Sequence, residues 1–159
     1  MMFRQILVAF ILVSINVSIH ATGMAELFSR LIRRQARMER EFSVVRSIFL
    51  FIEIFAIILG LHLAEICTWA IFYTRWAGLK DFEPSLYFSI VTYTTIGYGD
   101  VTLPVAWRLL GAIEGVTGVL TFGWSTGVIF AVASRLMVIR GKRNKFESDQ
   151  KVGLGEKKS

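Results

Sequence analysis

The sequence has little of what a soluble domain needs. A single cysteine, Cys67, excludes a disulfide within the chain. Charged residues make up 19% of the chain, where about 25% is usual. Two stretches, residues 5–25 and 115–134, contain no Asp, Glu, Lys or Arg at all. Each is long enough to cross about 30 Å of hydrocarbon. With 54% apolar residues, the chain is predicted to be an integral membrane protein rather than a soluble enzyme.

Outside the apolar segments, little sequence remains. Residues 26–46 and the tail from residue 141 are each about half of the ~40 residues at which a chain begins to fold unaided. A soluble catalytic or sensor domain does not fit into either piece. We therefore expect no enzymatic activity and no cofactor.

The positive charge is gathered in two places. Of 18 Lys and Arg, most lie either in one connecting segment (Arg30, Arg33, Arg34, Arg37, Arg40, Arg46) or in the tail (Arg135, Arg140, Lys142, Arg143, Lys145, Lys151, Lys157, Lys158). By the positive-inside rule both regions are cytoplasmic, and residues 75–108 face outside. This pattern predicts a multi-pass protein of the cell inner membrane that contacts lipid, and it argues against a nucleic-acid partner.

Two apolar segments form a predicted hairpin of membrane spans. Residues 49–73 are apolar apart from Glu53, His62 and Glu65, and a second apolar segment runs from about residue 104 to 137. Between them, residues 84–99 carry no charge, but a helix of this length reaches only about 24 Å. We therefore predict a re-entrant loop, with a half-helix entering the membrane and extended backbone returning from it. Irregular backbone at that depth is tolerated only when it is buried in protein or lines a water-filled path.

The N-terminal segment has two interpretations. Arg4, an apolar run and small residues near Ala21 resemble a cleaved signal peptide. Cleavage would place the following arginines outside, against the charge pattern, so we favour a retained third span. After it, residues 24–46 place apolar and basic residues on different helical faces, which is typical of a helix on the inner membrane surface. A solvated basic linker explains the same segment.

The returning part of the loop reads Thr94-Thr95-Ile96-Gly97-Tyr98-Gly99-Asp100. It resembles the selectivity filter of potassium channels, and the resemblance covers about residues 49–137, including Trp107-Arg108-Leu109 and Phe122-Gly123. The chain looks like a small bacterial two-span pore with an extra N-terminal span. The expected organisation is an all-α membrane protein with an N-terminal span (1–22), a basic amphipathic interfacial helix (23–46), a pore domain (47–139) and a cytoplasmic tail (140–159). The pore domain divides into an outer helix (47–74), a pore helix (84–94), a filter (95–99) and an inner helix (104–139).

The filter has a physical basis. Stacked backbone carbonyls replace the water shell of K+ when all of them point toward one axis. Successive residues of a strand alternate in direction, so this arrangement needs positive φ angles, which Gly97 and Gly99 adopt at little cost. Carbonyls of Thr95, Ile96, Gly97 and Tyr98, with the Thr95 hydroxyl, would bind K+. One chain forms one wall, so the resemblance implies a homotetramer.

The resemblance also suggests what surrounds the filter. We expect Tyr98 to point into the pore helix, where Tyr87, Phe88 and Thr94 support it, with Asp100 at the outer mouth; an ordinary aromatic core is the competing interpretation. Val91 stands where familiar small potassium channels carry a glutamate, which puts acid-driven inactivation of that type in doubt.

The second span is expected to line the inner pore. Gly118 matches the family's hinge position, although small residues also allow close helix packing. By alignment the lining residues are Val119, Phe122, Thr126 and Phe130. Phe130 is either a dewetting gate or a packing residue.

Ionisable residues within a span are functional suspects. Counted from the outer ends of their helices, His62 and Glu114 share a depth of roughly 15 Å. With Glu65 they form a predicted polar cluster behind the filter, either a structural network or a proton sensor. A metal site is not expected from His62 and Glu65, because two ligands are too few.

These features favour passive, potassium-selective conduction through a tetrameric pore. A regulatory or structural membrane subunit with a non-conducting pore loop, or a weakly selective cation channel, is the alternative.

Overall fold

Three long helices and one short helix make up a computed structural model that describes residues 2–40 and 43–156. The helices are α1 (Met2–Arg40), α2 (Val44–Trp76), α3 (Phe82–Tyr93) and α4 (Arg108–Glu156). No β-strand occurs in these residues. The three long helices each contain a stretch long and apolar enough to cross a membrane: Met2–Arg34, Val44–Trp76 and Arg108–Phe146. The predicted all-α membrane fold is therefore confirmed.

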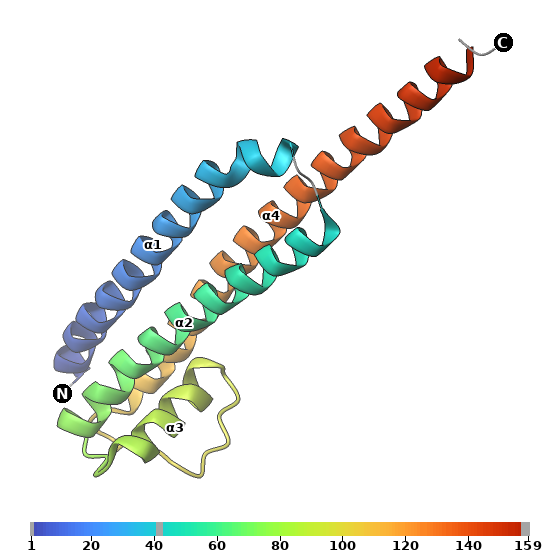
Figure 1. The fold of residues 1–159 in the computed structure, drawn as a ribbon. Coiled ribbons are helices and arrows are strands. Elements are labelled where there is room, and N and C mark those ends of the chain that lie inside the picture. Colours follow the sequence, from blue (N-terminus) through green and yellow to red (C-terminus); the bar gives the residue numbers. More distant parts are fainter. Residues whose placement is uncertain (1, 41–42, 157–159) are drawn as a thin grey trace.

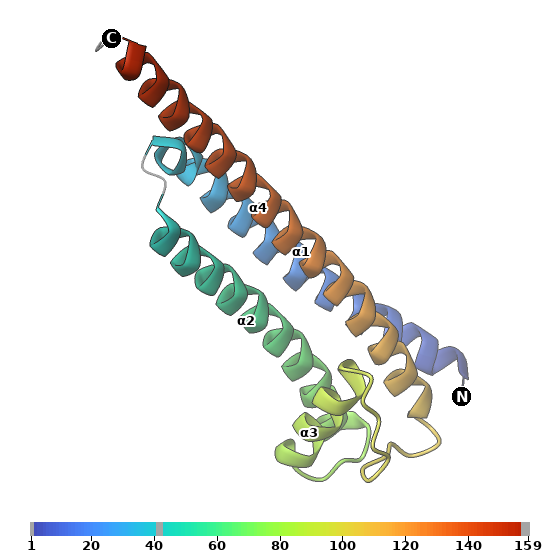
Figure 2. The same ribbon diagram turned by 90° about the vertical axis from the view of Figure 1, so that its right-hand side faces the viewer.

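The long helices lie side by side, and the short one sits at one end of them (Figures 1 and 2). α3 packs against α2 and α4. Its 12 residues reach about 18 Å, which is too short for a span. The N-terminus lies at the same end as α3, and the C-terminal end of α4 lies at the other. α3 and the loop that follows it correspond in position to the half-helix and returning loop that the sequence predicts.

The N-terminal segment forms one helix rather than two. The sequence predicts a boundary near residue 22 between a span and a surface helix, but α1 continues unbroken from Met2 to Arg40. Gly23 does not end the helix. It lies where α1 approaches α2, and a Cβ there would clash with the Leu61 side chain. The Glu26–Arg30 pair, four residues apart on the helix, also supports continuation.

The inner helix is also longer than predicted. α4 continues to Glu156, whereas the end of the apolar sequence predicts a helix ending at residue 139. Hydropathy marks the end of the membrane, not of the helix, and no proline follows to stop it. Residue 1, residues 41 and 42 of the predicted surface helix, and residues 157–159 of the predicted tail lie outside the described residues.

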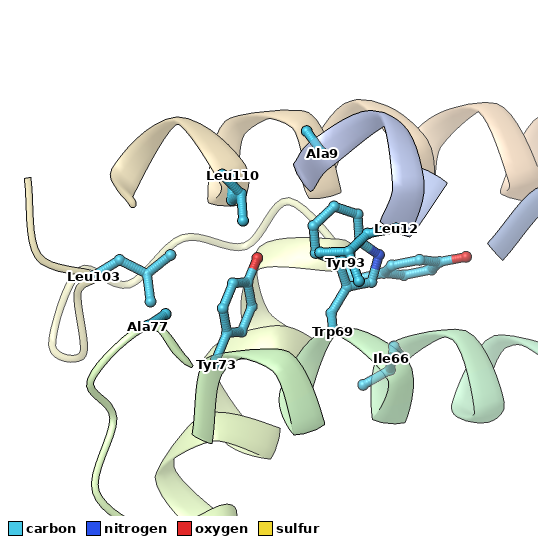
Figure 3. Packing of buried hydrophobic residues seen from close by; sticks show 9 residues of the cluster. All are labelled: Ala9, Leu12, Ile66, Trp69, Tyr73, Ala77, Tyr93, Leu103 and Leu110. Atoms are coloured by element: carbon cyan, nitrogen blue, oxygen red, sulfur yellow. The ribbon is translucent and has the colours of Figure 1, made fainter. Parts of the chain in front are cut away.

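Two apolar clusters hold the helices together. The cluster near α3 draws on all four helices (Figure 3): Ala9, Leu12, Ile66, Trp69, Tyr73, Ala77, Tyr93, Leu103 and Leu110. The cluster toward the other end joins α1, α2 and α4: Met24, Leu27, Leu50, Ile54, Ile58, Val128, Val132 and Leu136. On each long helix, buried polar residues lie between the two clusters in sequence, among them His20, Glu65 and Ser125. A polar layer therefore crosses the bundle between two apolar ones.

Candidate functional site

The loop after α3 has an alternating backbone. Thr95, Gly97 and Gly99 have φ angles of 59°, 60° and 81°. The positive φ expected at the two glycines is present, and Thr95 adopts it as well, although a β-branched residue rarely does. Every second residue is thus left-handed, which allows carbonyl groups along the loop to point to one side rather than alternate.

The start of the loop is fixed to the end of α3 through its amides. The Ile96 and Gly97 amides both donate to the Val91 carbonyl, at 2.9 and 3.2 Å, and the Thr95 amide donates to Thr92 O at 2.9 Å. The Thr94 hydroxyl donates to Ile90 O at 2.7 Å. These bonds use the amides of residues 95–97, so the carbonyls of these residues are not needed to attach this part of the loop to α3.

A second attachment joins the far end of the loop to α3. The Tyr87 hydroxyl donates to Asp100 Oδ2 at 2.7 Å. This bond lowers the pKa of Asp100, because it stabilises the carboxylate, and it raises the pKa of Tyr87. The loop is therefore held at both ends by the same short helix.

The aromatic residues around the loop differ in how far other side chains cover them. Phe88 packs edge-on against Tyr73, with ring centroids 5.2 Å apart, and a Cβ at Gly111 would lie 3.2 Å from its ring. Tyr98, by contrast, is 70% exposed. Tyr87 thus holds the loop through Asp100, whereas Phe88 packs against α2 and α4. Most of the Tyr98 side chain is left uncovered by its own subunit, where the sequence predicts that it packs into the pore helix.

The predicted cluster of buried ionisable residues divides into two groups. Glu114, fully buried, accepts hydrogen bonds from Tyr73 of α2, at 2.7 Å, and from Ser89 of α3. His62 and Glu65 lie deeper. The correction has a simple cause: α4 begins at Arg108 and α2 ends at Trp76, so Glu114 lies about 9 Å, and His62 about 21 Å, from the outer end of its helix.

The deeper group connects all four helices. Glu65 accepts from Tyr93 of α3 and contacts His20 Nδ1 of α1 at 2.7 Å. His62 lies 3.1 Å from both the Tyr93 hydroxyl and Ser125 Oγ of α4. The Tyr93 hydroxyl also contacts Thr121 Oγ1 at 2.6 Å. Tyr93 is two residues before Thr95, so this network reaches the base of the loop.

Sequence reasoning missed His20, Tyr93 and Ser125. His20 lies in residues 5–25, which contain no Asp, Glu, Lys or Arg, and a search for those four residue types does not find a histidine. Its presence in a predicted span, four residues after Asn16 on the same helical face, was the available signal. Both residues are fully buried.

The third charged or ionisable residue of the first apolar segment, Glu53, lies outside both groups. Glu53 of α2 pairs with Arg34 of α1, with Nη1 and Oε2 2.6 Å apart and both side chains partly exposed. This ion pair joins the basic end of α1 to α2.

The inner-helix residues take different positions. Val119 and Phe130 are 55% and 72% exposed, and Thr126 is exposed. Phe122 instead packs against His62 and Tyr93, with ring centroids 4.6 and 5.4 Å apart.

Gly118 provides a close approach between α4 and α3. A Cβ at Gly118 would lie 2.1 Å from the Tyr93 carbonyl oxygen. α4 is helical through this residue, so its visible role here is packing.

A comparison with known protein families finds a match. A family model described as "Ion channel" covers residues 47–135, more than half of the chain. The match spans α2, α3, the loop and most of the apolar part of α4, and α1 lies outside it. No solved structure matches the chain significantly.

Proposed function

Because this chain belongs to the ion channel family, we propose that it conducts potassium ions selectively, through a pore formed by four copies. The alternating backbone of residues 95–99 is the observation that carries this proposal. Carbonyls of Thr95, Ile96, Gly97 and Tyr98, together with the Thr95 hydroxyl, bind the dehydrated ion. Potassium is the permeating ion rather than a resident cofactor.

The exposure of the loop supports an assembly. Residues 95–100 are all exposed in the single chain, and irregular backbone inside a membrane must be covered by protein or line a water-filled path. In a homotetramer, one side of the loop faces the shared axis and neighbouring subunits cover the other. Tyr98 then packs against a neighbour, which accounts for its exposure here.

The two ends of the molecule suggest its orientation. The N-terminus and α3 lie at one end (Figure 1), while the arginines near the end of α1 and those at the end of α4 lie at the other. By the positive-inside rule the basic end is cytoplasmic and the filter lies toward the outside. This arrangement fits a cell inner membrane, with α1 retained as a third span.

The exposed face of α4 supplies the inner pore in this assembly. Val119, Thr126 and Phe130 lie on surface that the chain itself does not cover. Phe130 is the bulkiest of them and the nearest to the cytoplasmic end, so it is the proposed hydrophobic constriction. Phe122, packed on His62 and Tyr93, supports the filter instead.

Ion flux into liposomes tests the proposal. Purified protein should admit K+ and exclude Na+, and external Ba²⁺ should block the flux. Gly97→Ala should abolish flux, because residue 97 requires a φ of 60° that alanine adopts only with strain. Gly60→Ala is the matched control, since residue 60 lies in α2 with open space around its Cβ position.

The other outcomes identify the alternatives. Equal K+ and Na+ entry would show a weakly selective cation channel. A tetramer that passes neither ion, measured by light scattering and flux on the same preparation, would show a non-conducting subunit. A protein that is monomeric both in detergent and in lipid would contradict the proposed tetrameric pore.

A further inference from the structure

We propose that His20, His62 and Glu65 form a binding site for a divalent transition-metal ion of the zinc type, buried in the helix bundle. The three residues come from α1 and α2 and are 0%, 6% and 0% exposed. One ligand atom from each lies within 4.8 Å of the other two. In the sequence, His62 and Glu65 alone are too few for such a site, and the fold supplies the third ligand.

Two pairs of the ligand atoms lie close to each other. His20 Nδ1 lies 2.7 Å from Glu65 Oε1, and His62 Nδ1 lies 3.6 Å from Glu65 Oε2. A tetrahedral zinc ion, with bonds of about 2.0 to 2.2 Å, places its ligands roughly 3.4 Å apart. These two separations, one to each carboxylate oxygen, lie on either side of that value, so binding requires the side chains to move to a common distance from the ion.

The outer nitrogens of both rings are already held by one group. His62 Nε2 lies 3.1 Å, and His20 Nε2 3.4 Å, from Ser125 Oγ. With a metal on both Nδ1 atoms, each neutral ring carries its proton on Nε2 and donates it to Ser125 Oγ. A shared partner that fixes tautomer and ring orientation is what metal-binding histidines commonly have.

Tyr93 is placed to complete the coordination. Its hydroxyl contacts Glu65 Oε2 and lies 3.1 Å from His62 Nδ1, which makes it the oxygen available for a fourth position. Thr121 contacts the same hydroxyl at 2.6 Å. A bound ion would therefore connect α1 and α2 to the end of the pore helix.

The charge of the site favours a cation. In the described part of the chain, the ion-pair partners of Glu65 are His20 and His62. A buried carboxylate is stabilised by hydrogen bonds and by an opposite charge, and a bound metal ion would supply that charge. Two imidazoles with one carboxylate suit Zn²⁺ and Co²⁺, whereas Mg²⁺ and Ca²⁺ prefer oxygen ligands.

Metal content measures the site directly, because the chain has two histidines and both belong to the cluster. Protein expressed with zinc, purified with a histidine-free tag and analysed by mass spectrometry should carry about one ion per chain. Co²⁺ loaded after chelation should give the visible absorption of a tetrahedral complex. His20→Gln and Glu65→Gln should lose the ion, whereas Glu53→Gln, which changes an exposed carboxylate outside the cluster, should retain it.

Loss of the ion in the ligand variants could also result from misfolding, so a second variant keeps all three ligands. Ser125→Ala should bind Co²⁺ about 10 to 100-fold more weakly, as expected for loss of an outer-shell partner. Wild-type protein with far less than one ion per chain after both zinc and cobalt loading overturns the proposal, as does unchanged affinity in Ser125→Ala. Metal binding is measured without ion flux. The result therefore tests the metal site independently of the proposed potassium conduction.

Discussion

Replacing Gly118 by alanine should weaken the fold, against the usual effect of this substitution in a helix. Alanine in a helix interior is normally more stable than glycine by about 0.5 to 1 kcal/mol. Here the new Cβ would lie 2.1 Å from the Tyr93 carbonyl oxygen and 3.1 Å from its ring. The first contact is to backbone, which cannot rotate away. The two helices must therefore separate by about 1 Å, because packed interiors have no spare room.

The expected loss of stability depends on how little the Tyr93 backbone can move. Overpacking costs about 1 to 3 kcal/mol, and a contact to backbone puts the cost in the upper part of that range, at about 2 to 3 kcal/mol. After the helix gain of about 0.5 to 1 kcal/mol we expect a net loss of about 1 to 2.5 kcal/mol. On soluble-protein scaling this lowers the melting temperature by about 2 to 10 °C. Because Tyr93 lies two residues before Thr95, K+ flux should fall as well.

Thermal unfolding followed by circular dichroism in detergent measures this loss. Gly141→Ala is the matched control: it lies in the same helix, its Cβ position faces open space, and its stability should stay the same or rise. A Gly118→Ala protein that melts at or above the wild-type temperature would refute the close approach of α4 to α3.

Three smaller predictions follow from individual contacts. The lowered pKa of Asp100 contributes stability above the ordinary value of 3.8, and this contribution is lost as the pH falls through the folded pKa; Tyr87→Phe should move the carboxyl titration, followed by NMR, up toward that value, and an unchanged midpoint would contradict the bond. Removing the exposed Arg34–Glu53 pair by Glu53→Gln should change the free energy of unfolding by less than about 1 kcal/mol, and a larger loss in detergent would show that the pair is more than a surface contact. Glu114→Leu removes the acceptor of the buried Tyr73 hydroxyl, while Ser89 keeps the Ile66 carbonyl, and should lose about 1 to 3 kcal/mol; Glu114→Gln keeps a polar partner for Tyr73 and should lose less, and equal melting temperatures of the two variants would contradict this.

Local sequence signals predict the spans and the loop well. An apolar run of span length is its own evidence for a membrane helix, and α1, α2 and α4 each contain one. The loop motif is equally local, since the positive φ at Gly97 and Gly99 depends on residues that are adjacent in sequence. Helix ends were less predictable, because α1 and α4 continue beyond the apolar residues on helix-forming charged sequence.

The polar layer depends on registers that a single sequence does not contain. The depth of Glu114 was overestimated because α4 begins four residues later than the predicted inner helix. The partnership of His20 with Glu65 requires knowing how α1 is aligned along α2, and this alignment is set by contacts such as Gly23 against Leu61. Counting residues along each helix separately does not show how α1 is aligned along α2.

The role of α1 follows from these same contacts. The family match begins at residue 47, so α1 lies outside the matched segment. However, Glu65 lies within the matched segment, and one of its partners, His20, comes from α1. Leu109, also within that segment, donates its amide to Gln5 at 3.2 Å. Buried polar groups in a membrane must find partners within the protein, and here α1 provides them for residues on both α2 and α4. α1 is therefore part of the structure that holds α3 in place, through His20, Glu65 and Tyr93.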